Sequence, residues 1–150
     1  AQAVQAAWER RKLRSEPGRA SLLAGVARSA PALLSAYRLT QKAAGVGFDW
    51  NAAEEVLAKI DEEMAEVRVA LAAADKDAVR EELGDLLFTV ANLARKLDLD
   101  PEAALALANR KFRERFATME QAVAADGKTL DQVGREELEL LWEAAKKKEG

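Results

Sequence analysis

The sequence predicts an all-α fold, a bundle of helices in a single domain. Hydrophobic residues make up 49% and charged residues 33% of the chain, which is typical of a soluble globular domain with a sizeable core. Ala, Leu, Glu, Lys and Arg, which favour helices, recur along its whole length. No segment shows the sustained polar–apolar alternation or the hairpin turns that would predict strands.

Prolines, glycines and capping residues divide the chain into six expected helices. Pro31 suits the first turn of a helix, and Asp100 followed by Pro101 is a typical helix start. Gly45 and Gly127 suit helix ends. Asn51 is the expected cap of the third helix, and Asp75 or Asp77 is the expected cap of the fourth. Residues 15–25 are expected to form a loop. The expected helices cover residues 2–14, 31–44, 52–73, from the cap to about 97, 101–125 and 136–148.

The chain contains no Cys and no His. This excludes thiol catalysis, disulfides, Cys/His zinc sites and histidine general bases, so acid–base or metal chemistry must use Asp, Glu, Lys, Tyr or water. The net charge of −3 argues against broad binding of nucleic acid, which usually needs a basic face. No apolar stretch is long enough for a membrane span and no signal peptide opens the chain, so we expect a cytoplasmic protein.

The expected third helix carries acidic residues beside its apolar stripe. At about 100° per residue, Lys59, Glu63 and Glu66 fall on one flank of that stripe. Glu62 falls nearly opposite the core, so the neighbouring glutamates are not equivalent. The stripe itself consists of Val56, Leu57, Ile60, Met64, Val67 and Leu71.

The expected fourth helix repeats this arrangement. Glu82 lies at the edge of its apolar stripe, and Asp85 lies further round on the same side. Only a few residues connect the two helices, and short connections make antiparallel neighbours. The two acids of one helix can therefore face the two acids of the other. The stripe of the fourth helix consists of Val79, Leu83, Leu86, Leu87, Val90, Leu93 and Leu97.

Four carboxylates gathered in one place need a cation. A single like-charge pair at about 4 Å costs roughly 4 kcal/mol at an effective dielectric near 20. Oxygen ligands without His or Cys select magnesium or manganese over zinc. A water held by such a metal or by a carboxylate could attack phosphorus while the metal neutralises phosphate charge. The alternative is an ordinary solvated face, since glutamates three apart on a helix usually have that role.

The acidic residues resemble a known signature. Glu62-Glu63-x-x-Glu66, then fifteen residues, then Glu82-x-x-Asp85 is similar to the pattern of the MazG-type nucleoside triphosphate pyrophosphohydrolases. Further segments resemble the same family over nearly the whole chain, namely 46–50, 82–88, 92–95, 108–116 and 141–146.

The resemblance implies a magnesium-dependent enzyme, with Mn²⁺ as a substitute, that cleaves nucleoside triphosphates at the α–β bond. The products would be a nucleoside monophosphate and pyrophosphate, and the role would be clearance of nucleotide pools. It also implies a MazG-like helical bundle that works as a homodimer or higher oligomer. The chain resembles the C-terminal half of the two-domain members, so we expect one domain over 1–150, with a helical lead-in over 1–30 and the catalytic bundle over 31–150.

The resemblance also assigns roles to individual residues. Glu63, Glu66, Glu82 and Asp85 match the family's metal ligands. As our own hypothesis, Glu82, or Glu63 through a metal-bound water, is the best candidate for orienting the attacking water. The residues that match substrate-binding positions are Lys59, Glu62 as an outer group, Glu81, Lys111, Arg115, Trp142 and Lys146.

Simpler roles remain open for the residues of the later helices. Lys111 and Arg115 share a helix face and could be solvated, and Trp142 could be a core residue rather than a base-stacking one. A different class of function is also open, a non-catalytic helical oligomer that binds a nucleotide or a partner protein. A di-iron type of bundle is disfavoured because such bundles use Glu-x-x-His.

Overall fold

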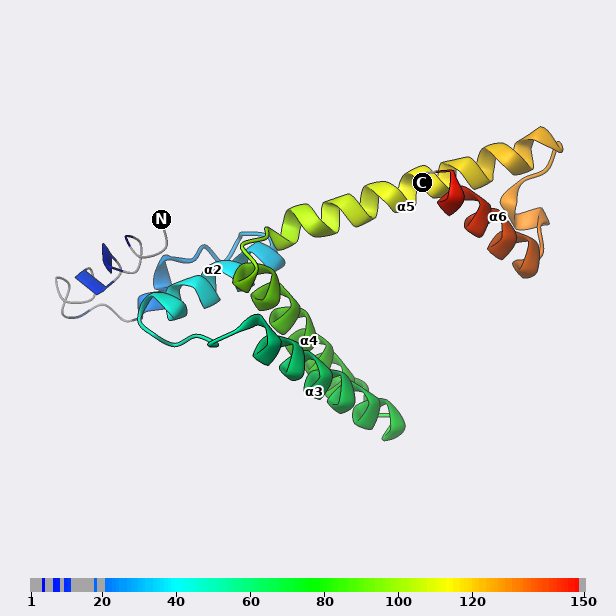
Figure 1. Cartoon of the computed structure of the whole chain (residues 1–150). Helices are drawn as coiled ribbons and strands as arrows, with labels where there is room; N and C mark the ends of the chain where they lie inside the picture. Colours follow the sequence, from blue (N-terminus) through cyan, green and yellow to red (C-terminus); the bar gives the residue numbers. More distant parts are fainter. Residues whose placement is uncertain (1–3, 5–6, 9, 12–17, 19–20, 149–150) are drawn as a thin grey trace. The chain divides into compact units, whose positions relative to one another are not determined.

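The structure, a computed structural model, describes residues 4, 7–8, 10–11, 18 and 21–148, and within these it is all helical (Figure 1). This confirms the predicted fold class. No helix of the described part has both the length and the apolar character that a membrane crossing requires. The elements are η1 (Leu22–Gly25), α2 (Ala32–Gly45), α3 (Ala53–Ala72), α4 (Lys76–Lys96), α5 (Pro101–Ala125), η2 (Leu130–Gln132) and α6 (Arg135–Lys147).

The starts of α3 and α4 test the predicted N-cap residues. The side chain of Asp75 accepts hydrogen bonds from the backbone N–H groups of Asp77 and Ala78, so Asp75 is the cap of α4. The prediction for Asn51 is wrong, because Ala52 occupies the cap position of α3. Asn51 instead donates to the carboxylate of Glu55 from its backbone N–H at 3.1 Å and from its side-chain amide at 3.2 Å.

Other boundaries agree with the sequence within one or two residues. Asp100 accepts a hydrogen bond from the N–H of Glu102 at 2.8 Å, so the predicted start of α5 is confirmed. Two short 3-10 helices were not predicted: η1 lies inside the expected loop 15–25, and η2 follows α5. The helix expected over 2–14 lies largely outside the described residues.

The chain forms two compact units, 1–102 and 103–150, and each is described by itself. In the first unit α3 runs alongside α4, and α2 packs against α4 (Figure 1). Three residues connect α3 to α4, so the two helices return side by side, as the sequence predicted. The expectation of a single catalytic domain stays a prediction.

The apolar stripes predicted for α3 and α4 are only partly buried. Val56 and Val67 of α3 are buried, but Leu57, Met64 and Leu71 of the same stripe are exposed. On α4 the exposed members of the predicted stripe are Leu83, Leu87, Val90 and Leu97, while Thr89, Ala91, Asn92 and Arg95 are buried. The assignment of one core stripe per helix is therefore wrong, because periodicity alone does not separate the row that faces a neighbouring helix from a second apolar row that does not.

The second unit contains most of α5, η2 and α6. Met119, Val123, Val133 and Ala145 are its buried apolar residues. The ring of Phe112 lies 5.9 Å from that of Phe116 and 5.4 Å from that of Trp142, measured between centroids. Aromatic contacts thus connect α5 to α6.

Candidate metal centre

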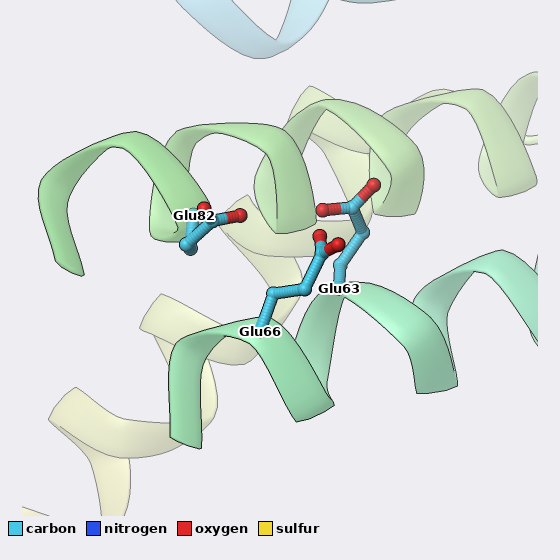
Figure 2. Close-up of side chains that lie close together, drawn as sticks. All are labelled: Glu63, Glu66 and Glu82. Atoms are coloured by element: carbon cyan, nitrogen blue, oxygen red, sulfur yellow. The ribbon is translucent and has the colours of Figure 1, made fainter. Parts of the chain in front are cut away.

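Three carboxylates from two helices converge in the first unit. Figure 2 shows Glu63 and Glu66 of α3 turned toward Glu82 of α4. One oxygen of each residue lies within 4.8 Å of the others. Glu63 and Glu66 are one turn apart on α3, so they share a face of the helix. The antiparallel pairing of α3 and α4 places that face opposite Glu82. The arrangement offers oxygen atoms of the kind that a hard divalent cation binds.

The carboxylate of Glu63 is incompletely satisfied. Its side chain is buried, with the residue only 4% exposed. Oε1 lies 2.8 Å from Nζ of Lys59, but Oε2 is buried and finds no hydrogen-bond donor in the described part of the chain. Leaving such an atom without a partner costs about 1–3 kcal/mol, and more when the group is charged. A bound cation would supply the missing partner, so these residues fit a metal.

Electrostatics in the cluster also favour a cation. The pKa of Glu66 is raised, mainly by the partial removal of water and next by the negative charges of Glu63 and Glu82. The positive charge of Lys59 offsets only part of this increase. A raised carboxyl pKa means that the negative form is disfavoured where it stands. A divalent cation among the three groups would reverse that effect.

Asp85, the fourth predicted ligand, lies outside this group of three. Among the described residues it does not share the close oxygen cluster, but it lines a cavity that Glu63 also lines. It sits one turn after Glu82 on α4, on the side of the helix that continues toward the cavity. Its role as a ligand stays a prediction.

Of the other residues predicted around the cluster, Lys59 contacts it directly and Glu62 contacts Lys59. Lys59 bridges two carboxylates, with Nζ 2.8 Å from Oε1 of Glu62 and 2.8 Å from Oε1 of Glu63. These hydrogen bonds, first that of Glu62 and then that of Glu63, raise the pKa of Lys59, so it stays positively charged. Glu62 points to solvent, as helix geometry indicated, and Glu81 is exposed beside Glu82.

A cavity of about 620 Å³ adjoins the cluster. Helices α2, α3 and α4, residue Leu23 of η1 and the segment 48–50 before α3 contribute to its walls, and most of the wall's surface area is apolar although polar and charged residues also line it. The lining residues are Leu23, Leu39, Thr40, Ala43, Phe48, Asp49, Trp50, Lys59, Glu63, Asp85, Phe88, Thr89, Asn92 and Arg95. The volume lies within the range of small-molecule sites.

Asp49 ties the segment before α3 to the end of α4. Its carboxylate accepts hydrogen bonds from both terminal nitrogens of Arg95, and Nζ of Lys96 lies 3.1 Å from Oδ2. Nζ of Lys96 also donates to the backbone oxygen of Trp50 at 2.5 Å. Burial alone would raise the pKa of Asp49, but the hydrogen bonds from Arg95 and then Lys96 lower it below its usual value.

The sequence reasoning singled out Lys59, Glu63 and Asp85, which line the cavity. It did not identify the pairing of Asp49 with Arg95 and Lys96 or the contribution of α2 to the cavity walls. Asp49 and Arg95 are 46 residues apart, and no local pattern connects them. The one available signal was the run 48–50, in which an acid stands between two aromatic residues directly before a helix.

The residues predicted to bind phosphate and base from the later helices lie in the second unit. Lys111, Arg115 and Trp142 line a cavity of about 360 Å³. The guanidinium carbon of Arg115 lies 5.6 Å from the ring centroid of Trp142, a cation–π contact. Lys146, one turn further along α6, pairs with Glu143 at 2.8 Å. The structure thus brings three of these four residues together, and their role in binding stays a prediction.

Comparison with known proteins gives a consistent result. Residues 51–119 match the family described as the MazG nucleotide pyrophosphohydrolase domain. The chain is 47% identical over 116 residues to the nucleoside triphosphate pyrophosphohydrolase/pyrophosphatase MazG of Thermotoga maritima, covering 77% of this chain and 44% of that protein. It is 40% identical over 150 residues to the nucleoside triphosphate pyrophosphohydrolase of Escherichia coli K12, covering 97% of this chain and 57% of that protein. The chain therefore spans about half the length of these relatives.

Proposed function

The chain carries a MazG nucleotide pyrophosphohydrolase domain, and from this we propose that it hydrolyses nucleoside triphosphates at the α–β bond to a nucleoside monophosphate and pyrophosphate. The observation that carries the proposal is the buried, unpartnered Oε2 of Glu63, which stands in a cluster of three carboxylates. Such a cluster is costly in a purely structural role and useful for holding a cation beside phosphates. The corresponding cellular role is clearance of nucleotide pools in the cytoplasm.

We propose Mg²⁺ as the resident ion, with Mn²⁺ as a substitute. Glu63, Glu66 and Glu82 would hold it, and Asp85 would join them from the cavity side. When bound, the ion supplies charge neutralisation on the phosphates and activation of water. Oxygen-only ligation and the absence of His and Cys support a hard ion over zinc.

The protein's own residues would position the water and the substrate. Glu82 or Glu63 would accept a hydrogen bond from the attacking water and orient it toward phosphorus. Lys59, held beside the cluster by Glu62 and Glu63, places a positive charge where phosphate oxygens would approach. Glu81 would line the nucleotide site.

Lys111, Arg115 and Lys146 would bind the phosphates of a nucleoside triphosphate. Trp142 would orient Arg115 through their cation–π contact and would stack with the base of the nucleotide. Arg and Lys are the usual partners of phosphate oxygens, Arg as a two-pronged donor and Lys as a point charge.

We also propose a homodimer or higher oligomer as the working form. The support is the second apolar row of α3 and α4, where Met64, Leu83 and Leu87 are exposed in the single chain. Large apolar side chains left exposed on two neighbouring helices are typical of an interface.

Product analysis tests the proposed activity. With Mg²⁺ and a nucleoside triphosphate, the products should be a monophosphate and pyrophosphate, whereas release of single orthophosphate would contradict cleavage at the α–β bond. Glu82→Gln should abolish turnover with unchanged helical circular dichroism. Glu54→Gln is the matched control, because Glu54 is an exposed glutamate in the first turn of α3. Stabilisation by Mg²⁺ and nucleotide without any product would favour the non-catalytic binding protein instead.

A further inference from the structure

We propose that Asp49 is a positioning residue, which fixes one wall of the substrate site by joining the segment 46–50 to the last turn of α4. It acts through Arg95 and Lys96, the two basic residues of that turn. This inference rests on the proposed function and adds to it a residue that stands outside the carboxylate cluster.

The segment 46–50 leaves α2 through a hydrogen-bonded turn. Gly47 has a φ of +95°, in the left-handed region that glycine adopts without strain, and its N–H donates to the oxygen of Ala44 at 3.0 Å. The N–H of Phe48 donates to the oxygen of Ala43 at 3.0 Å. Backbone hydrogen bonds therefore attach the first part of the segment to the end of α2.

The residues that follow lack such support from the backbone. Figure 1 shows the connection between α2 and α3 as an extended trace. Among the described residues, 49–51 take part in no backbone–backbone hydrogen bond outside the helices, and Ala52 begins α3 without a side-chain cap. Contacts with side chains must therefore decide where Asp49 and Trp50 lie.

Arg95 and Lys96 of α4 supply these contacts. The carboxylate of Asp49 accepts hydrogen bonds from Nη1 of Arg95 at 3.4 Å and from Nη2, and Nζ of Lys96 lies 3.1 Å from Oδ2. Nζ of Lys96 also donates to the backbone oxygen of Trp50 at 2.5 Å. The side chain of Arg95 is 10% exposed and that of Asp49 is 23% exposed, so water and salt screen this pair less than a surface pair.

Arg95 in turn depends on Asp49 for its charge balance. Arg95 is buried, and its Nε donates to Oδ1 of Asn92 at 2.9 Å. Asn92 is neutral, and the carboxylate that pairs with the guanidinium is that of Asp49. Removal of one partner of a buried ion pair leaves an uncompensated charge, so without Asp49 the guanidinium would turn toward water. The segment and the guanidinium would then both leave the wall.

The wall that Asp49 holds belongs to the cavity beside the carboxylates. Asp49, Trp50 and Arg95 line this cavity together with Glu63, which is also a member of the carboxylate cluster. Any part of the substrate that extends from the cluster into the cavity would lie against this wall. A wall that is already ordered lowers the entropy cost of binding.

The carboxylate cluster itself should not depend on Asp49. Val56 of α3 and Ala91 of α4 are completely buried, and the short connection between α3 and α4 joins the two helices at one end. Packing and connection should keep the helices paired when the ion pair is lost. We therefore expect loss of Asp49 to weaken substrate binding without a matching loss of metal binding or turnover.

Steady-state kinetics tests this expectation. Asp49→Asn should raise KM for a nucleoside triphosphate by about three- to tenfold, the size expected when side chains must be ordered on binding, while kcat stays within about twofold. Asp49→Glu keeps the charge and should recover part of the loss. Asp77→Asn is the matched control, because it removes an ion pair with Arg80 whose side chains are 86% and 78% exposed. An unchanged KM in Asp49→Asn, or a kcat that falls as far as KM rises, would overturn the proposal.

The fluorescence of Trp50 tests the attachment of the segment without substrate or metal. The full chain with Trp8→Phe and Trp142→Phe retains Trp50 as its single tryptophan. Adding Asp49→Asn to this chain should increase the quenching of Trp50 by acrylamide and shift its emission to longer wavelength, because the segment leaves α4. Asp77→Asn in the same chain should change neither. Identical quenching with and without Asp49→Asn, in chains with equal circular dichroism, would overturn the proposal.

Calorimetric titration with Mn²⁺ separates the wall from the carboxylates. Asp49→Asn should bind Mn²⁺ as the wild type does, whereas Glu63→Gln should lose this binding. A loss of Mn²⁺ affinity in Asp49→Asn as large as its rise in KM would show that Asp49 acts through the cluster, which contradicts the proposal.

The outcomes distinguish the positioning role from the activity. Pyrophosphate release by the wild-type chain, together with a Trp50 that does not respond to Asp49→Asn, would refute the positioning role and leave the activity standing. A Trp50 that responds in a chain without pyrophosphate release would refute the activity and leave standing the attachment of the segment by Asp49.

Discussion

Nζ of Lys59 lies 2.8 Å from Oε1 of Glu63, one turn further along α3, and the second oxygen of Glu63 is buried without a donor among the described residues. The lysine therefore satisfies only one side of a buried carboxylate. The unsatisfied side, together with Glu66 and Glu82, is where a cation fits.

Replacement of Glu63 tests this proposed cation site most directly. Glu63→Gln keeps the shape of the side chain but removes its charge, so we expect a loss of activity of at least about 100-fold, since even outer-shell partners of a metal are worth 10–100-fold. Thermal stability without metal should not fall, because a buried and partly unsatisfied charge is removed. Steady-state assays and thermal unfolding measure the two effects, with Glu54→Gln as the control. Activity within tenfold of the wild type would exclude Glu63 as a ligand.

Removal of the metal gives a second prediction. Mg²⁺ or Mn²⁺ at about 100 times its dissociation constant should stabilise the native chain by about 2.7 kcal/mol. For a domain of this size the midpoint of thermal unfolding should then rise by about 5–10 °C. Chelation by EDTA should reverse the shift, and Glu63→Gln should lack it. An equal shift in that variant would place the ion elsewhere.

The Asp49–Arg95 ion pair predicts a specific pH dependence of stability. Because the pKa of Asp49 is lowered in the folded protein, its ionised form stabilises the fold above the unfolded value near 3.8, and this contribution is lost as the pH falls through the lower folded value. Asp49→Asn should cost about 1–2 kcal/mol at pH 7, since it removes hydrogen bonds to a charged group.

Urea unfolding of the wild type and Asp49→Asn at several pH values measures the difference. It should be constant from pH 5 to 8 and shrink below pH 4. A difference that stayed the same at pH 3 would show that ionised Asp49 is not its source.

The exposed apolar row of α3 and α4 predicts that association depends on it. Leu87 is 56% exposed on α4, and Leu87→Arg would bury a charge in the proposed interface. We expect this variant to sediment as a smaller species than the wild type with unchanged helix content. Leu140→Arg is the control, because Leu140 is 72% exposed but lies on α6. An unchanged sedimentation coefficient in Leu87→Arg would remove this row from the interface.

Arg115 gives a test of the second unit. Arg115→Ala should raise KM for a nucleoside triphosphate by about tenfold or more, because a charge-assisted hydrogen bond to phosphate is worth about 1.5–3 kcal/mol. Arg115→Lys should recover part of the loss, since it keeps the charge but not the two-pronged geometry. The turnover number should change less than KM, and an unchanged KM in Arg115→Ala would exclude a phosphate contact.

The sequence by itself determined the helical character of the chain and most helix boundaries, because caps, breakers and the 3.6-residue period are local signals. Asp75 and Asp100 cap helices as their local chemistry requires. The pairing of α3 with α4 followed from their short connection, and with it the approach of Glu63 and Glu66 to Glu82.

Only the tertiary structure decided which face of each helix is buried and what surrounds the carboxylates. The apolar period of α3 pointed to Met64 and Leu71 as core, yet both are exposed while Glu63 is buried. The cavity and the ion pair of Asp49 with Arg95 arise from residues far apart in the chain. A local pattern records how a residue is oriented on its own helix, whereas burial and long-range pairing depend on which neighbours the folded chain brings against it.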